Sequence, residues 1–402
     1  MGLLVATAVA ALAFWPQAGV LGQDLYFANS VDLDPAAGAT LDPWCGHRTY
    51  DTHTGDDVTI RSFREVMIGV PVFSLTEGTI NEVQDGEFDF HYGTATSQFD
   101  NHVIVDAGDG RQFVYGHLRH GLPWHRGEIV HEGQQIGWTA SSGNSSWPHL
   151  HLTERIDFVP RDPFAGPCRP GPSDFAEQPQ AFRDAPYVRN LAVSPKPFRG
   201  DAQLPWDTAV RTGTFVRGTR ELYFRVELGE YRGGTERVQL RRPDGSVALD
   251  DPSAAWTSDG VGGPPAHDFH ERARFDVLGT WRLQYSLGGA VLADAPLRVV
   301  ARASQARNRP PNAVTVSLRL STVAQCTIGT SLVTRDPDYD IVRYHYRWSV
   351  GAHVLRQVTS AGLTDILQHG LAKPGETVRC AVSPSDGKAS GRTVSASAQV
   401  PG

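Results

Sequence analysis

The chain has 402 residues, a length that predicts two to four domains at roughly 100–200 residues each. Its 41 glycines and 27 prolines, with frequent Val, Thr and aromatic residues, favour strands and turns, and 40% hydrophobic content argues against a disordered protein. Lys and Arg number 37 against 44 Asp and Glu, and the net charge of −7 excludes a general nucleic-acid binder.

The N-terminal segment is uncharged and mostly apolar over residues 1–22. It is too short for a comfortable membrane span and is typical of a signal peptide, although positive residues at its start are missing. Val20 and Gly22 predict cleavage before Gln23, and a buried N-terminal helix is the alternative. No later stretch reaches about 18 apolar residues, so we expect an exported chain, periplasmic or secreted, without stable membrane insertion.

The four cysteines agree with export, because disulfides persist in oxidising compartments. Four cysteines allow three connectivities. Pairing within each region, Cys45 with Cys168 and Cys326 with Cys380, is the arrangement that respects the expected domain boundaries. Free buried thiols are the alternative. No C-x-x-C motif is present, so neither a zinc ribbon nor a thioredoxin-type site is indicated.

Residues 23–172 form the first predicted domain, and ten of the 15 histidines lie in it. This region holds 9 Arg, no Lys and 21 Asp and Glu, whereas residues 173–402 hold 28 basic and 23 acidic side chains. A Pro-rich stretch from Pro160 to Pro172 marks its end. We therefore look for chemistry in this acidic, histidine-rich region.

The first histidine motif is His53-Thr-Gly-Asp-Asp57. Neutral imidazole and carboxylate are both good zinc ligands. Gly55 removes a side chain between them and lets the backbone bend, so that both reach one ion. Alone the motif is weak, because His and Asp four residues apart are common by chance.

Two further segments, Arg111–Leu118 and Pro148–Leu152, read as strands. Alternation in the first predicts that His117 lies on a strand beside Gly116, which permits close approach. In the second, residues i and i+2 share a face, so His149 and His151 would point together into a cleft. Two histidines on one face of an otherwise apolar strand cost folding free energy unless they bind a metal, a water or a substrate oxygen.

Taken in this order, the segments resemble the lysostaphin-type (LytM-like) zinc metallopeptidases, whose landmarks are H-x-G-x-D, Y-x-H-L and H-x-H. The chain has His53…Asp57, Tyr115-Gly-His117-Leu118 and a Gly/Ser-rich stretch that ends in His149-Leu-His151. Supporting matches cover Val70–Ile80, Asn101–Val105 and Arg126–Gly137. The resemblance covers about residues 45–157. It implies a zinc endopeptidase that hydrolyses peptide cross-links of bacterial peptidoglycan.

The resemblance also implies roles for individual residues. His53, Asp57 and His151 would bind Zn²⁺, the expected cofactor, and leave an open position for water. His149 would be the general base, and His117 would stabilise the oxyanion or relay the proton. Tyr50 is a weaker candidate for stabilising the transition state. The remaining histidines match no ligand position and are interpreted as structural or rim residues: His47, His91, His102, His120, His125 and His131.

Two departures from the family pattern leave the ligands intact but affect the expected substrate preference. Leu152-Thr153 follows the H-x-H, and the segment Gln84–Gln98 is longer and more acidic than a tight hairpin needs. Two other functions stay open: a catalytically silent wall-binding or regulatory protein, and a metallopeptidase that acts on Gly-rich proteins. Degenerate relatives usually lack ligands, so the complete set favours the enzyme. The oligomeric state is left open.

Two β-sandwich modules are predicted after the first domain, at residues 173–303 and 304–402, separated by an extended Asn308–Asn312 linker. The middle module is indicated by alternating segments at Glu221–Glu227, Arg237–Arg241 and Gly279–Ser286. In the last, Asp336-Pro-Asp-Tyr-Asp340 before Tyr344–Trp348 resembles immunoglobulin-like and PKD-like modules. Its Asp residues form either a calcium site or, more simply, a solvated turn.

The expected fold class is therefore all-β: a LytM-like antiparallel β-sheet peptidase domain followed by two Ig-like β-sandwich domains.

Overall fold

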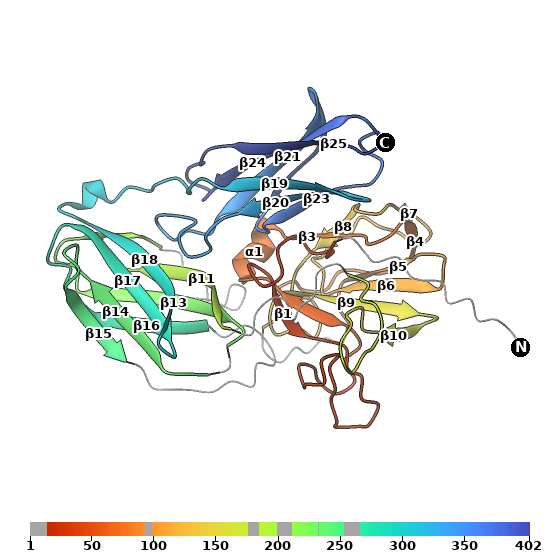
Figure 1. Cartoon of the computed structure of the whole chain (residues 1–402), viewed down its shortest axis with the longest axis horizontal. Coiled ribbons are helices and arrows are strands. Elements are labelled where there is room, and N and C mark those ends of the chain that lie inside the picture. The colour runs from red at the N-terminus through yellow and green to blue at the C-terminus, as the bar shows by residue number, and fades with distance from the viewer. Residues whose placement is uncertain (1–13, 93–98, 176–184, 199–210, 232, 253–265) are drawn as a thin grey trace, which may run out of the picture.

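The computed structural model describes residues 14–92, 99–175, 185–198, 211–231, 233–252 and 266–402. Within these residues the regular structure is almost entirely strand, apart from the short helix α1 (Phe63–Ile68) and the 3-10 turn η2 (Ala303–Gln305). The expected all-β fold class is confirmed. The strands form an N-terminal, a middle and a C-terminal unit (Figure 1).

The N-terminal unit is built on one large antiparallel sheet with the order β1-β2-β9-β6-β5-β4-β7, and β10 pairs with β9. A separate small sheet pairs β3 with β8. The strands are β1 (Tyr26–Asn29), β2 (Asp56–Thr59), β3 (Pro71–Phe73), β4 (Gly78–Gln84), β5 (His102–Asp106), β6 (Arg111–Gly116), β7 (Ile129–Val130), β8 (Gln135–Trp138), β9 (His149–Ile156) and β10 (Val159–Arg161).

The middle unit packs a three-stranded sheet, β11-β13-β16, against a five-stranded sheet, β12-β18-β17-β14-β15. Its strands are β11 (Tyr187–Ser194), β12 (Thr214–Val216), β13 (Glu221–Gly229), β14 (Glu236–Arg241), β15 (Val247–Pro252), β16 (Ala266–Arg272), β17 (Gly279–Leu287) and β18 (Ala290–Val300). The three expected alternating segments are strands, and the turn after β14 closes through Gly245, whose φ of 86° suits glycine.

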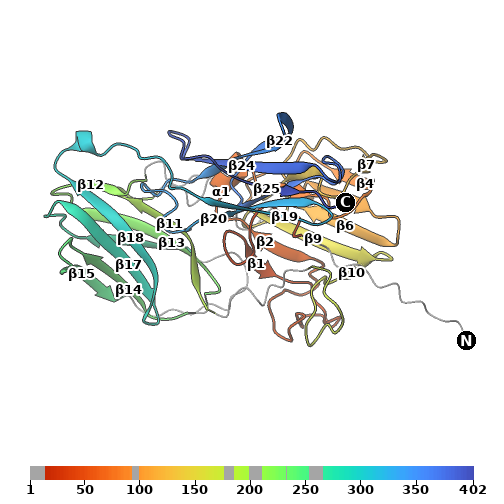
Figure 2. The same ribbon diagram turned by 45° about the horizontal axis from the view of Figure 1, so that its top comes forward.

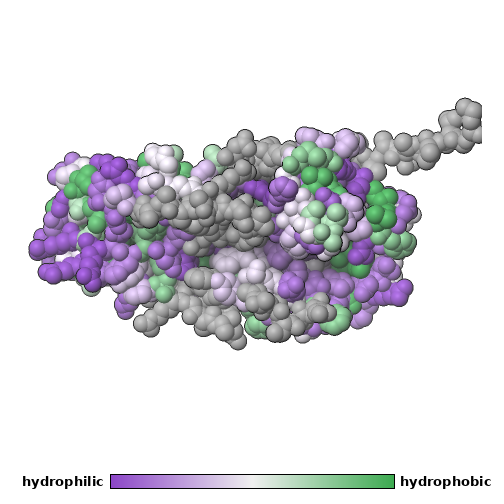
Figure 3. Space-filling model, turned by 90° about the horizontal axis from the view of Figure 1, so that it is seen from below, coloured by the Kyte–Doolittle hydropathy of each residue, from purple (hydrophilic) through white to green (hydrophobic). Residues whose placement is uncertain are grey.

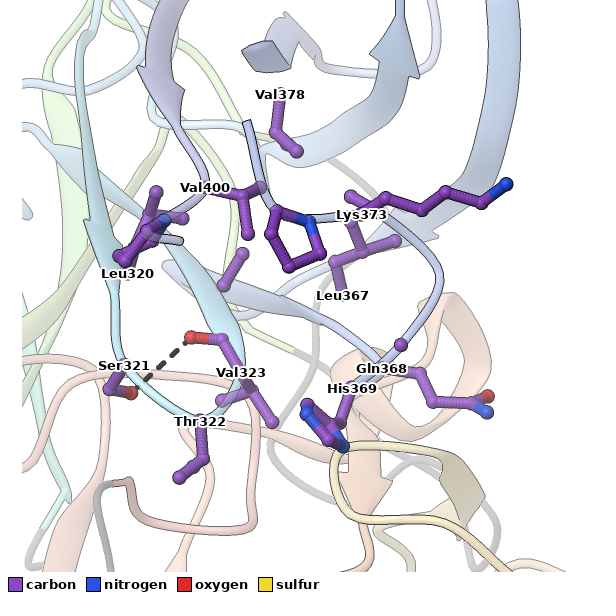
Figure 4. Close-up of a pocket in the computed structure, with 15 residues that line it drawn as sticks. Leu320, Ser321, Thr322, Val323, Leu367, Gln368, His369, Lys373, Val378 and Val400 are labelled. Atoms are coloured by element: carbon purple, nitrogen blue, oxygen red, sulfur yellow. Dashed lines mark hydrogen bonds between the residues drawn. The ribbon is translucent and has the colours of Figure 1, made fainter. Parts of the chain in front are cut away.

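The C-terminal unit packs the sheet β19-β20-β23 against the sheet β22-β21-β24-β25. Its strands are β19 (Thr315–Leu320), β20 (Ala324–Gly329), β21 (Arg343–Val350), β22 (His353–Ser360), β23 (Thr364–Leu367), β24 (Thr377–Ser385) and β25 (Val394–Gln399). At one end a cavity of about 300 Å³ opens between Leu320, Val323, Leu367, Val378 and Val400 (Figure 4). None of these five residues belongs to the histidine motifs.

Both expected disulfides are present. Cys45 is joined to Cys168 with an S–S distance of 2.04 Å, and Cys326 to Cys380 with 2.07 Å. The second bond joins β20 to β24 and therefore links the two sheets of the C-terminal unit. The first ties the segment after β10 to the loop that precedes the His53 motif.

The Pro-rich stretch is part of the N-terminal fold. Pro160 lies in β10, Phe164 is fully buried, and Phe175 packs against the ring of Phe164 with centroids 5.4 Å apart. The N-terminal core thus extends past residue 172 to Phe175. We propose three domains that follow the three hydrophobic cores, with boundaries close to those expected.

The end of the apolar N-terminal segment is packed inside the molecule. Phe14 and Trp15 are 2% and 3% exposed, Ala18 N–H donates to Pro71 O at 2.8 Å, and Gly19 N–H donates to Thr364 Oγ1 at 2.7 Å. Residues 14–22 therefore form a wedge between the N-terminal and C-terminal units. The expected cleavage before Gln23 would remove this packed wedge; residues 1–13 of the expected signal peptide lie outside the described residues.

The three units contact one another through buried charged groups. Arg61 Nε donates to Glu65 Oε1 at 2.6 Å, and its Nη2 donates to Ala361 O of the C-terminal unit at 2.9 Å. Arg189 of the middle unit donates to the carbonyl oxygens of Asp24 and Thr59, each at 3.0 Å. Figures 1 and 2 show the middle and N-terminal units side by side, with the C-terminal unit lying across the N-terminal one.

The Asp336–Asp340 turn is held by groups of the protein. Asp336 Oδ1 accepts from the N–H groups of Asp338 and Asp340, and Asp338 pairs with Arg309. Lys388 Nζ lies 2.7 Å from Asp340 Oδ2. The backbone amides and the two cations use these carboxylates, which favours the interpretation of a turn over that of a calcium site. In the part of the chain that the structure describes, no helix is long and apolar enough to span a membrane.

Candidate metal centre and active site

The candidate site lies where β2 and β9 pair at the centre of the N-terminal sheet. Asp57 stands directly opposite His151, and Thr59 stands opposite His149. Leu150 and Leu152 are buried on the core face, so the alternation of a strand turns both histidines to the other face. The predicted shared orientation of His149 and His151 is found.

The three expected ligands converge on one point. His53 Nε2 lies 3.2 Å from Asp57 Oδ2 and 3.2 Å from His151 Nδ1, and His151 Nδ1 lies 3.0 Å from Asp57 Oδ1. Metal–ligand bonds of about 2.0–2.2 Å in a tetrahedron put ligand atoms about 3.3–3.6 Å apart, slightly farther than these atoms lie without an ion. The donor set and its spacing therefore fit a zinc ion with a fourth position for another ligand, and this cluster could bind a metal.

Hydrogen bonds to neighbouring groups hold the three ligands in position. His53 Nδ1 donates to Ser30 O at 2.7 Å, so its Nε2 faces the cluster. His151 Nε2 lies 3.0 Å from Thr153 Oγ1, and Asn29 Nδ2 donates to Asp57 Oδ2 at 3.0 Å. Such partners fix the tautomer and the direction of a ligating imidazole.

Glycine at position 55 is required by the close approach of His151. A Cβ atom there would lie 2.6 Å from His151 Nε2 and 2.7 Å from Leu152 O. Space for the ring of His151 is therefore a second reason for Gly55, besides the bend expected from the motif.

His149 lies beside the cluster and faces it with Nε2. Its Nδ1 donates to Trp147 O at 2.7 Å, and its Nε2 lies 3.3 Å from Asp57 Oδ1. Burial opposes a charged imidazole, but the Asp57 carboxylate outweighs it and raises the pKa of His149. Burial likewise opposes charge on Asp57, but His53 and His149 outweigh it and hold the pKa of Asp57 well below its usual range.

His117 comes directly after β6, one residue beyond the end of the strand. The expectation that it lies within the strand is therefore wrong by one position. Its φ of 55° ends the strand, and such a conformation is uncommon outside glycine. The turn brings the ring of His117 to a centroid distance of 4.4 Å from that of His149.

The environment of His117 keeps the ring neutral. Burial and the nearby His149 lower the pKa of His117 to about 3. Its Nδ1 donates to Ser142 O at 2.7 Å, which leaves Nε2 as a proton acceptor. Asp100 Oδ2 accepts from the backbone N–H of His117 at 2.8 Å and fixes the turn.

Tyr50 lies over the ligand His53, with ring centroids 4.2 Å apart and planes at 28°. It is 48% exposed, so its ring covers His53 while its edge stays open to solvent. The six other histidines of this region bind groups outside the cluster, namely Thr40 (His47), Gly143 (His91), Asp100 (His102), Asp89 (His120), Glu128 (His125) and Glu77 (His131). Their interpretation as structural or rim residues fits these contacts.

Sequence reasoning missed the residues that orient the catalytic candidates. Asp100, Asn29 and Ser30 lie far from the motifs in sequence, and Ser142 and Trp147 act through their backbone carbonyl oxygens. A carbonyl acceptor leaves no signature in residue type. Asp100 directly precedes the segment that matched a family strand, and this position was the one available signal.

Residues 53–163 match the model of Peptidase family M23. In the search of curated proteins, no protein matches the chain. Among solved structures, the chain is similar to the catalytic domain of the antimicrobial peptidase lysostaphin from Staphylococcus simulans. The identity is 22%, the match covers 35% of this chain and 89% of that one, and the TM-score is 0.24.

Two further solved structures are similar. The catalytic domain of the prophage-encoded M23 protein EnpA from Enterococcus faecalis is 23% identical over 35% of this chain and 86% of that one, with a TM-score of 0.24. A zinc-containing peptidase from Vibrio cholerae is 20% identical over 37% of this chain, with a TM-score of 0.24, and the match spans 40% of that chain. Residues 53–163 are a domain of Peptidase family M23, and further β-rich units follow it.

Proposed function

We propose that the protein is an exported zinc-dependent metalloendopeptidase that hydrolyses peptide bonds in bacterial peptidoglycan cross-links. The observation that carries the proposal is the convergence of His53, Asp57 and His151, with His149 and His117 beside them. The match of this segment to Peptidase family M23 supports peptide-bond hydrolysis. The two disulfides support export, because such bonds form in oxidising compartments.

Zinc bound at His53, Asp57 and His151 would lower the pKa of a bound water toward neutrality and polarise the scissile carbonyl. The Nδ1 of His149 donates to Trp147 O, so its Nε2, which faces the cluster, is the atom that would accept a proton there. His149 then takes the proton of the attacking water and gives it to the leaving amine. Neutral His117, with Nε2 as an acceptor, orients the water or relays the proton; in this form it cannot donate to an oxyanion.

Substitution of individual histidines tests these roles. We expect His151→Ala to lose both zinc and cleavage, because one of three ligands is gone. His149→Ala is expected to keep zinc but to cleave purified peptidoglycan about 10²–10⁴-fold more slowly, the usual contribution of a general base. Zinc is measured by elemental analysis and cleavage by mass spectrometry of released peptides.

His125→Gln is the matched control, since its side chain is 82% exposed and lies outside the cluster. It is expected to behave as the wild type. Stoichiometric zinc without cleavage of peptidoglycan would instead favour a silent wall-binding protein. Cleavage restricted to Gly-rich proteins would change the proposed substrate class but would leave the proposed peptide-bond hydrolysis unchanged.

A further inference from the structure

The outer sheet of the C-terminal unit carries positive charge without matching negative charge. None of its strands, β22, β21, β24 and β25, contains Asp or Glu. Arg343, His345 and Arg347 of β21 alternate with side chains of the buried core, and Arg379 of β24 does the same. Among the described residues, no ion pair joins these three arginines to a carboxylate. We call these four residues the basic face.

The middle unit shows that this chain otherwise neutralises arginines on sheet surfaces. Arg237 pairs with Asp250 across β14 and β15, and Arg282 pairs with Asp294 across β17 and β18. Figure 3 shows mainly hydrophilic residues at the left end of the molecule, where Figure 1 places the middle unit. Opposite charges on neighbouring strands stabilise a sheet, and like charges destabilise it. The basic face lacks this stabilisation. That is expected of a surface whose negative counter-charges are supplied by a bound partner.

Two hydroxyl groups contact side chains of the basic face. Arg379 Nη2 lies 3.0 Å from Ser395 Oγ, and His345 Nδ1 lies 2.8 Å from Thr359 Oγ1. The planar guanidinium of arginine binds phosphate through two parallel hydrogen bonds, and hydroxyl groups add further donors. Three arginines on two adjacent strands of an open sheet suit a row of phosphates along an extended chain.

The distribution of charge along the chain indicates that the negative charge opposite the basic face comes from another molecule. Residues 304–402 hold 11 Lys and Arg against 6 Asp and Glu, whereas residues 23–172 hold 9 against 21. The basic face is the side of its sheet that points away from the buried core and from the sheet β19-β20-β23 (Figures 1 and 2). The edge strand β22 of the same sheet reaches the N-terminal unit, where Arg356 Nη2 donates to Gln135 Oε1 at 2.9 Å. A polyanion bound on the basic face would therefore lie on the outer side of this sheet.

The chemistry of the face distinguishes between polyanions. Single-stranded nucleic acids are bound by stacking of bases on exposed aromatic rings. The aromatic residues of the four strands, Tyr344, Tyr346 and Trp348, are all fully buried. We propose that the basic face binds a phosphodiester-linked polymer of the bacterial cell wall and so holds the enzyme at its substrate. The choice of a wall polymer rests on the proposed function, but the anion-binding surface does not.

The probe is poly(glycerol phosphate), with binding to the full chain measured at increasing NaCl. We expect wild-type binding that weakens with salt, and at least tenfold weaker binding by Arg343→Gln/Arg347→Gln/Arg379→Gln. Each lost phosphate contact is expected to reduce the log–log salt slope by about 0.7. The double variant Arg347→Gln/Arg379→Gln, which keeps Arg343 beside the turn at Gly387, is expected to lose part of the binding and guards against misfolding.

The matched control removes three paired arginines of the middle unit, Arg237, Arg242 and Arg282, by substitution with Gln. It changes the net charge equally and is expected to leave binding unchanged. Cleavage of a soluble cross-link peptide is expected to be unchanged in the basic-face variants, so failure here is distinguishable from failure of the proposed function. Equal binding by the double and triple variants and the wild type would overturn the proposal. So would tighter binding to single-stranded DNA or acidic vesicles than to poly(glycerol phosphate).

Discussion

At the scale of single residues, the site depends on close approach as much as on ligand type. Gly55→Ala keeps all five candidate residues but places a Cβ atom 2.6 Å from His151 Nε2. Because this contact displaces a ligand, we expect zinc affinity to fall about 10–100-fold, as when an outer partner of a ligand is lost. Competition with a chromophoric chelator measures the affinity. Wild-type affinity in this variant would contradict the role given to Gly55.

The carboxyl group of Asp100 is expected to make the free energy of unfolding depend on pH. Burial opposes its charge, but hydrogen bonds from His102 and His117 outweigh it and lower the pKa of Asp100. Its unfolded pKa is about 3.9, so the stabilisation is complete above that pH and is lost as the pH falls toward the lower folded pKa. We expect Asp100→Asn to flatten the stability profile between about pH 4 and 2, measured by urea unfolding. An identical slope in both proteins would exclude this role.

The three histidine motifs, through their resemblance to a known family, pointed to five central residues, and the structure brings these five together. The pairing of Asp57 with His151, 94 positions apart, follows once both segments are strands of one sheet. Ser142 and Trp147 could not be predicted, since their carbonyl oxygens are available at every residue. The one signal for Asp100 was its position directly before the matched segment Asn101–Val105, and its contact with the turn at His117 could not be predicted from that position.

At the scale of elements, the N-terminal segment shows the limit of hydropathy. An uncharged apolar run fits both a signal peptide and a buried segment, because both are selected for low polarity. The structure packs residues 14–22 between two units, with Gln17 Nε2 donating to Thr139 Oγ1 at 3.0 Å. No pattern in the sequence predicts this hydrogen bond, since Gln17 and Thr139 are 122 positions apart.

Removal of this wedge tests the packing directly. A chain that starts at Gln23 loses Phe14, Trp15 and Leu21, all buried in the N-terminal core. Full burial of one such side chain contributes about 1.5–3 kcal/mol, so we expect stability to fall by more than about 4 kcal/mol relative to a chain that starts at Phe14. Differential scanning calorimetry of the two chains measures the loss. Equal melting temperatures would show that the wedge is dispensable.

At the scale of the whole molecule, the net charge of −7 averages parts of opposite character. The acidic N-terminal unit carries the candidate active site, and the C-terminal unit carries the excess of positive charge. Arg61 and Arg189 join the units through buried hydrogen bonds, which favours a fixed arrangement over independent domains. The proposed enzyme therefore holds its candidate active site and its basic face in a constant relative position.

The most direct test of the central claim is cleavage of purified peptidoglycan by the full chain before and after removal of metal. We predict that the chelated protein releases no peptides, and that one equivalent of Zn²⁺ restores cleavage to the wild-type protein but not to His151→Ala. Full activity in a metal-free sample would contradict the account.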